Sequence, residues 1–331
     1  MVIQEMVLMR FWKACVTALL LLPGAPSLAD EGPALNFQDR VSIGEVNRIL
    51  REKIKQTTEK KTFYFGFDIR ADPFEDAQQY VPFLDYLDRA TGYDFKLHLT
   101  LKNSSIVDDL GTGKVDFAAI GAVSFIQARE KYGVLSLARG VNGSGKTEYQ
   151  SAIVVSPGSP IRNVAELKGK RFAFGSASST QGYLIPRIVL KEQGVLLNDL
   201  AAYSFMGTHK KCAETVISGV SDACGMQDAM AKAMAGEGLL RVLYMSRYYP
   251  SSGIAANKDV APGVLKKVKR ALLGFDPLGR DKEGLYDWQK TEMPNGFKAG
   301  GAADYAVLRD WMVRFGILKK TGAPESGKTL E

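Results

Sequence analysis

Short apolar segments alternate with amphipathic segments from residue 62 onward. The first apolar segment predicts a strand over 63–69, and the next segment predicts a helix over 77–91 with Val81, Leu84, Leu87 and Ala90 on one face. The alternation continues with predicted strands at 94–99, 115–120 and 134–141 and predicted helices at 104–111 and 124–132. Strands separated by helices indicate an α/β domain built on a mostly parallel sheet.

A second unit of the same kind begins near residue 150. Predicted strands at 151–156, 171–175, 202–206, 222–226 and 239–245 alternate with helical segments at 164–167, 180–193, 209–218 and 228–235. The remainder, 252–319, predicts two helices (262–273 and 303–315) around a polar loop. It has too few strands for a third domain, so we expect it to return to the first unit.

This pattern predicts two lobes with flanking helices and a hinged cleft between them. The first lobe would comprise 61–149 plus 246–331 and the second 150–245, after an N-terminal extension at 30–60. Tyr149, Tyr248 and Tyr249 lie where the chain would cross between lobes. Packing at a hinge is the simpler interpretation of these tyrosines, and a wall of a ligand site is the alternative.

The first 29 residues have the pattern of a secretory signal peptide. Arg10 and Lys13 precede a short apolar run at 16–22, and Ser27-Leu28-Ala29 offers a cleavage site before Asp30. The apolar run is too short to span a bilayer. We therefore expect an exported, periplasmic protein of about 300 residues after cleavage, enough for two domains of ordinary size.

Charge and cysteine content narrow the class of ligand. The formal net charge is +7, and it becomes +6 when a leader containing Glu5, Arg10 and Lys13 is removed. The basic residues are scattered rather than interleaved with aromatics, so nucleic acid is not an expected partner, whereas a mild positive field suits a small anion. Cys212 and Cys224 could form a disulfide in an oxidising compartment or remain buried thiols.

The sequence offers no recognisable catalytic or metal-binding motif. There are two histidines, and neither an HExxH nor a GxSxG motif is present, nor a set of Cys and His residues with metal-ligand spacing. We expect neither enzymatic activity nor a cofactor or metal. A hydrolase of small phosphoesters stays an alternative that turnover assays would decide.

The most informative local feature is the turn Ser178-Ser179-Thr180-Gln181-Gly182, between a predicted strand and a predicted helix. The hydroxyls of Ser178, Ser179 and Thr180 could donate to an oxyanion, and Gly182 permits close approach of the backbone. The N–H groups at a helix start and the helix dipole also favour negative charge. Ordinary N-capping by Ser or Thr is the competing interpretation, and on composition alone it is the better one.

Other polar residues follow predicted strands and would lie at the edge that faces the cleft. His209 could donate to a ligand oxygen or serve only as an exposed capping residue. Gln227 could bind a ligand oxygen, and Asp228 could bind an amine or cap a helix. In the first lobe, Arg70 stands close to Asp68 and could simply pair with it, and Ser124 could cap a helix or contact a ligand.

Several blocks of the chain resemble the phosphate/phosphite/phosphonate-binding proteins of ABC transporters, a branch of the type II periplasmic binding proteins. They are YVPFLDYLDRATGYDFKL (80–97), LGTGKVDFAAIGAVSFIQA (110–128), YQSAIVVSPGSPIRNVAELKGKRFAFGSASSTQGYLIPR (149–187) and the stretch from His209 to Asp228. The resemblance extends over roughly 62–318. It implies the two-lobe type II fold, a monomer, and delivery of a small oxyanion to an ABC permease in the inner membrane.

The resemblance also implies roles for individual residues. The oxyanion would be held by Ser179, Thr180 and Gly182, with help from His209, while Asp228 would hold a ligand amine. The family turn is typically STSG, and Gln181 here replaces its second serine, which leaves the ligand open among phosphonate, phosphite, phosphate and others. A sensor that contacts a membrane receptor kinase is the alternative function for the same fold.

Overall fold

The computed structural model describes residues 44, 45, 48, 60–70, 72–101 and 104–319. The predicted leader and most of the predicted N-terminal extension lie outside these residues. The chain divides into the units 1–59 and 60–331, and the fold below concerns the second. Among the described residues, no helix has the length and apolar character needed to cross a membrane.

The first lobe is built on a six-stranded sheet with the order β13-β4-β12-β3-β1-β2. Its strands are β1 (Thr62–Phe67), β2 (Asp94–Leu97), β3 (Phe117–Ile120), β4 (Leu135–Gly140), β12 (Gly253–Ala256) and β13 (Phe297–Lys298). β1 pairs in parallel with β2 and β3, while β12 lies antiparallel between β3 and β4. The strand β3 is buried along its whole length, as expected for a strand covered on both faces.

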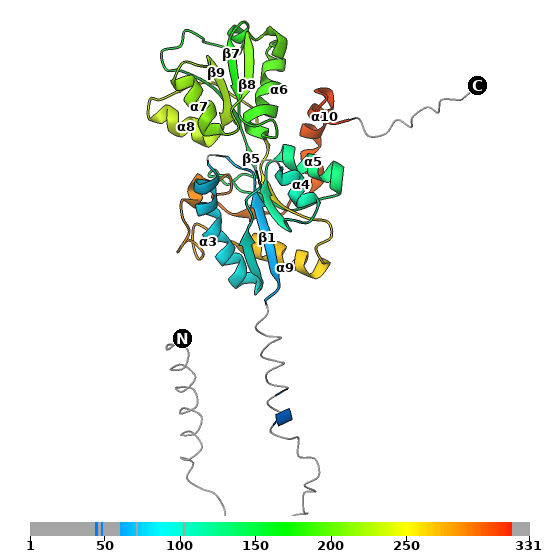
Figure 1. Ribbon diagram of the computed structural model, residues 1–331. Helices are drawn as coiled ribbons and strands as arrows, with labels where there is room; N and C mark the ends of the chain where they lie inside the picture. Colours follow the sequence, from blue (N-terminus) through cyan, green and yellow to red (C-terminus); the bar gives the residue numbers. More distant parts are fainter. Residues whose placement is uncertain (1–43, 46–47, 49–59, 71, 102–103, 320–331) are drawn as a thin grey trace, which may run out of the picture. The chain divides into compact units, whose positions relative to one another are not determined.

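Helices cover both faces of this sheet (Figure 1). On one face α3 (Pro73–Thr91) packs with α9 (Pro262–Gly274), and on the other lie α4 (Ile106–Gly111), α5 (Ala122–Tyr132) and α10 (Ala306–Arg314). α3 begins sharply because Asp72 accepts hydrogen bonds from the N–H groups of Phe74 and Glu75, and Pro73 fits the first helical position. It ends at Gly92, which adopts the left-handed conformation with φ of 69°.

The second lobe contains a five-stranded sheet with the order β10-β6-β9-β7-β8. Its strands are β6 (Ser151–Val155), β7 (Arg171–Phe174), β8 (Ala202–Phe205), β9 (Ala223–Gln227) and β10 (Arg241–Met245). α7 (His209–Ile217) and α8 (Asp228–Gly236) lie on one face, and a π-helical turn, η3 (Thr180–Leu184), leads into α6 (Ile185–Glu192) on the other (Figure 1).

The two sheets confirm the predicted α/β two-lobe fold but correct one detail. Each sheet has mixed rather than mostly parallel pairing, because a strand of opposite direction is inserted into it. In the second sheet this strand is β6, which pairs antiparallel with both β9 and β10. In the first sheet it is β12. Both inserted strands follow a passage of the chain between lobes, so they enter from the opposite end.

The segment 252–319 adds two strands, β12 and β13, to the first sheet, and the sequence pattern predicts neither of them. β12 is short and rich in small residues, yet all four of its residues are buried. At Gly253 an added Cβ would lie 2.2 Å from the carbonyl oxygen of Ala138, so this position requires glycine. Strand propensity therefore gives no signal where close packing decides the structure.

The two passages between the lobes run side by side. β5 (Glu148–Tyr149) pairs antiparallel with β11 (Tyr249–Pro250), and Tyr149 lies opposite Tyr249. Tyr249 stacks against the guanidinium of Arg247 and accepts a hydrogen bond from its Nε, which fits the hinge-packing interpretation for this tyrosine. The residue limits predicted for the lobes as moving bodies stay a prediction.

Cys212 of α7 and Cys224 of β9 form a disulfide, with their Cα atoms 5.9 Å apart. The structure thus selects one of the two states that the sequence left open. The bond ties the helix that begins at His209 to the middle of the second sheet.

Candidate functional site

A cavity of about 940 Å³ lies between the two lobes. The first lobe contributes the residues after β1, Asp68 and Arg70, and the start of α5, including Ser124. The second lobe contributes the hydroxyl turn before η3 and His209 at the start of α7. The carboxyl ends of strands from both sheets therefore meet at one cleft, as open α/β sheets lead one to expect.

The structure brings most of the predicted site residues together in this cavity and leaves others outside its lining. Those that line it are Arg70, Ser124, Ser178, Ser179, Thr180, Gln181 and His209. Gly182, Gln227 and Asp228 are not among the residues that line the cavity.

Gly182, the last residue of the turn, is closely surrounded by other atoms. An added Cβ there would lie 2.8 Å from Ser179 Oγ, 2.9 Å from His209 Cε1 and 3.1 Å from Gly175 Cα. Glycine is thus required by close packing between the turn, β7 and the histidine, rather than by a positive φ.

The serines of the turn are engaged locally. Ser179 is the N-cap of η3, and its Oγ accepts a hydrogen bond of 2.8 Å from the Gly182 N–H. Ser178 Oγ is 3.1 Å from Ser176 Oγ. Ser179 therefore acts as a helix cap in this structure, as the N-capping interpretation predicts.

Thr180 has a different role, because it reaches the other lobe. Its Oγ1 accepts a hydrogen bond of 3.0 Å from the N–H of Val123, in the first turn of α5. The N-cap of α5 is Gly121, which offers no side-chain hydrogen bond to the helix start. The hydroxyl oxygen thus occupies the positive end of a helix dipole, where an oxyanion would also be stabilised.

His209 is a buried residue rather than an exposed capping one. Its side chain is 4% exposed, and its backbone N–H donates across the cleft to the carbonyl of Arg70 at 3.0 Å. Burial lowers the pKa of His209 to about 4, so the ring is neutral at physiological pH. A neutral imidazole has one donor and one acceptor nitrogen, and it can donate to a ligand oxygen without adding charge.

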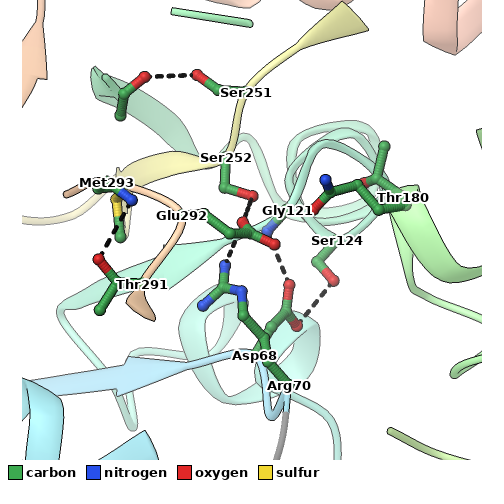
Figure 2. Close-up of polar contacts among 12 residues, drawn as sticks. Asp68, Arg70, Gly121, Ser124, Thr180, Ser251, Ser252, Thr291, Glu292 and Met293 are labelled. Carbon is green, nitrogen blue, oxygen red and sulfur yellow. Dashed lines mark hydrogen bonds and ion pairs between the residues drawn. The ribbon is translucent and has the colours of Figure 1, made fainter. Parts of the chain in front are cut away.

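Arg70 does not pair with Asp68 in the way that the sequence allowed. Its guanidinium donates to Glu292 Oε2 at 2.8 Å and to Tyr80 OH at 3.0 Å. Asp68 instead accepts hydrogen bonds from the Gly121 N–H at 2.8 Å and from Ser124 Oγ at 3.0 Å (Figure 2). Ser124 is fully buried and holds Asp68, and it does not cap α5.

Glu292 is the main site residue that the sequence analysis missed. It comes from the loop before β13, is 9% exposed, and lies between Arg70 and the Ser252 hydroxyl (Figure 2). Burial opposes its ionisation, but Arg70 and Ser252 outweigh that effect and hold the pKa of Glu292 below its ordinary value. A lone Glu in a polar loop carries no sequence signal, and only the folded loop brings it to the cleft.

Gln227 and Asp228 do not line the cavity, and each contacts another residue of the second lobe. Gln227, at the end of β9, is buried opposite Ser151 of β6. Asp228 Oδ1 accepts a hydrogen bond of 3.1 Å from Gln181 Nε2, and Oδ2 lies 3.6 Å from Lys232 Nζ. The N-cap of α8 is Gln227, so the alternative in which Asp228 caps this helix is wrong by one residue.

Four buried polar atoms on residues that line the cavity have no hydrogen-bond partner within the part of the chain that the structure describes. They are Thr100 Oγ1, Tyr149 OH, Gln181 Oε1 and His209 Nδ1. Buried polar groups are normally satisfied, so such a cluster indicates groups that a bound ligand or water would complete. Across the same described residues, His, Cys, Asp and Glu form no cluster of three suited to a metal ion.

Comparisons with known proteins agree with this architecture. A family model described as the periplasmic substrate-binding protein of a phosphonate ABC transporter matches residues 65–305. The phosphate-import protein PhnD of Mycolicibacterium smegmatis is 26% identical over 245 residues, covering 65% of this chain and 73% of the relative. The phosphonates-binding periplasmic protein of Escherichia coli is 24% identical over 220 residues, covering 62% of this chain and 64% of the relative.

Among solved structures, PhnD1 from Prochlorococcus marinus in complex with methylphosphonate has a TM-score of 0.70 at 20% identity. That match covers 78% of this chain and 99% of PhnD1, which establishes a common fold. The family model spans more than half of the sequence, from β1 of the first lobe through the second lobe to Tyr305. The chain therefore belongs to the phosphonate-binding family of periplasmic ABC transporter substrate-binding proteins.

Proposed function

We propose that this protein captures a small phosphorus oxyanion, namely a phosphonate, phosphite or phosphate, in the cleft between its lobes and delivers it to an ABC permease. The observation that carries the proposal is the presence of two unpartnered atoms, Tyr149 OH and His209 Nδ1, on neutral groups that can donate, beside the starts of α5 and η3. Helix starts and neutral donors stabilise an anion without placing a compensating cation in the site.

The ligand class draws support from the relatives, which are named for phosphate import and for phosphonate binding, and from the methylphosphonate complex of a protein with the same fold. The same names support work in the periplasm with an ABC permease as partner. We further propose that the protein acts as a monomer and without a cofactor. The sensor alternative gains no support from any of them.

The contacts across the cleft suggest how the ligand would be enclosed. His209 N–H donates to the Arg70 carbonyl, Val123 N–H donates to Thr180, and Lys210 Nζ lies 3.0 Å from Glu75 Oε1. We propose that 61–149 plus 246–331 and 150–245 move as two bodies about the paired strands β5 and β11, and that these contacts form on closure.

The direct test is calorimetry on the purified chain with phosphate, phosphite, methylphosphonate and 2-aminoethylphosphonate. We expect at least one of them to bind with 1:1 stoichiometry and to reduce the radius of gyration measured by X-ray scattering. Absence of binding by all four would refute the ligand class. Binding without compaction would refute the closing motion alone.

A further inference from the structure

Gln181 has an amide whose orientation is fixed by its neighbours. Its Nε2 donates to the Gln150 carbonyl at 2.7 Å and to Asp228 Oδ1 at 3.1 Å. A peptide carbonyl can only accept a hydrogen bond, so the NH₂ end must be the end that faces Gln150. The other end, Oε1, is left as an acceptor without a partner on a side chain that is 2% exposed and lines the cavity.

The groups around the cleft also favour a ligand with a donor. The described residues that line the cavity include four carboxylates and three cations, with His209 held neutral. At the end of the cavity formed by Asp68, Arg70 and Glu292, the Arg70 guanidinium is already paired with Glu292. Asp68 is a second carboxylate at this end.

Four other ionisable groups are packed around this end: Tyr80 and Asp76 of α3, Tyr149 of β5 and Asp228 of α8. Tyr80 OH accepts a hydrogen bond from the Arg70 guanidinium, and Asp76 accepts one from the Arg70 backbone N–H. None of these supplies a spare cation for a doubly charged ligand.

We propose that the cleft selects a singly charged oxyanion that keeps one proton, and that Gln181 Oε1 accepts the hydrogen bond from this P–OH group. The proposal rests on the proposed function and names the form of the ligand that the site takes. Gln181 belongs to the same turn as Thr180 and both residues line the cavity, so we place the P–OH group at this turn rather than at the far end of an organic substituent.

A proton-bearing oxyanion explains the orientation of the Gln181 amide, with Oε1 left as a free acceptor, better than a ligand amine does. The carboxylate of Asp228, which the sequence analysis considered for an amine, is occupied by the Gln181 amide and lies near Lys232. An acceptor that is buried beside carboxylates repels an unprotonated oxyanion, because two lone pairs would face each other. Sulfonates, which carry one negative charge and no proton, should therefore be excluded despite a similar shape.

The test compares methylphosphonate with methanesulfonate by calorimetry, in the wild-type chain and in Gln181→Met. We expect the wild-type chain to bind methylphosphonate at least about tenfold more tightly than methanesulfonate. Met has a similar length without an acceptor oxygen, so the variant should lose about tenfold in affinity for methylphosphonate and nothing for methanesulfonate. Gln193→Met, at an exposed position at the end of α6, is the matched control and should keep the wild-type ratio.

The outcomes separate the two proposals. Equal binding of both ligands by the wild-type chain would overturn the proposal that the cleft selects a protonated oxyanion. This comparison uses only the wild-type protein, so it does not depend on the folding of a variant. An unchanged ratio in a folded Gln181→Met variant would overturn the role of Gln181. If none of the phosphorus oxyanions binds the wild-type chain, the proposed function itself is wrong and this inference is wrong with it.

Discussion

The Val123 N–H and Thr180 Oγ1 form a 3.0 Å hydrogen bond that joins the start of α5 in the first lobe to the hydroxyl turn of the second. The two groups are 57 residues apart in sequence. The contact places a hydroxyl oxygen of one lobe at the positive end of a helix in the other. The proposed closure of the lobes and the proposed oxyanion site therefore involve the same few atoms.

Replacement of Thr180 by Val should weaken ligand binding. Val has the shape of Thr but offers no oxygen to Val123, so the N–H at the start of α5 loses its acceptor. We expect affinity for the best phosphorus oxyanion to fall about tenfold with little change in melting temperature. The matched control is Thr215→Val, because Thr215 Oγ1 bonds only the Cys212 carbonyl within α7. Equal losses in both variants would contradict this role for Thr180.

An added methyl group at Gly182 should disturb the turn. Gly182→Ala would place a Cβ 2.9 Å from His209 Cε1, so the turn or the imidazole must move. We expect a loss of about 1–3 kcal/mol in the free energy of unfolding, and weaker ligand binding. Gly158→Ala is the control, since an added Cβ there meets no atom within 4 Å. A crystal structure of Gly182→Ala with an unmoved His209 would refute the steric explanation.

Removal of the charge on Glu292 should destabilise the fold. In Glu292→Gln the buried Arg70 guanidinium keeps its charge and loses its carboxylate partner. We expect the free energy of unfolding in urea to fall by about 3–5 kcal/mol. Asp259→Asn breaks an exposed ion pair with Lys258 and should change it by less than about 1 kcal/mol. Similar small effects from both substitutions would show that Arg70 finds another partner.

Protonation of His209 should make the fold less stable in acid. Its pKa is about 4 when folded, against an ordinary value of 6.5, so the unfolded chain binds more protons between these limits. Above pH 6.5 the ring is neutral in both states, so its protonation does not reduce the free energy of unfolding. As the pH falls from 6.5 toward 4, this free energy decreases by about 3 kcal/mol. The free energy of unfolding of His209→Gln, measured across this range, should lack this part of the slope. A parallel slope in wild type and variant would contradict the burial of a neutral ring.

The Cys212–Cys224 disulfide should stabilise the second lobe. We expect Cys212→Ala/Cys224→Ala to lower the free energy of unfolding by about 2–4 kcal/mol, because the open chain gains freedom when unfolded. A reducing agent should lower the melting temperature of the wild-type chain and leave the double variant unchanged. If the wild-type chain is insensitive to reduction, the bond does not contribute to stability.

Patterns within short contiguous segments predict much of the fold and part of the site. The alternation of strands and helices predicted the two α/β lobes, because each segment shows its own hydrophobic period. The hydroxyl turn and His209 could be found because each directly follows a recognisable strand. The sequence does not predict β12, because its small residues form a strand only through pairing and close packing between β3 and β4.

The sequence by itself determined which residues could begin a helix, form a buried strand or offer a hydroxyl, since these are properties of short segments. Only the tertiary structure decided which polar groups meet. It paired Arg70 with Glu292, held Asp68 with Ser124, turned the Gln181 amide toward Gln150 and left the amide oxygen without a partner. The physical reason is that hydrogen-bond partners and burial depend on distances between distant segments, and these distances exist only once both sheets and the loop before β13 have folded.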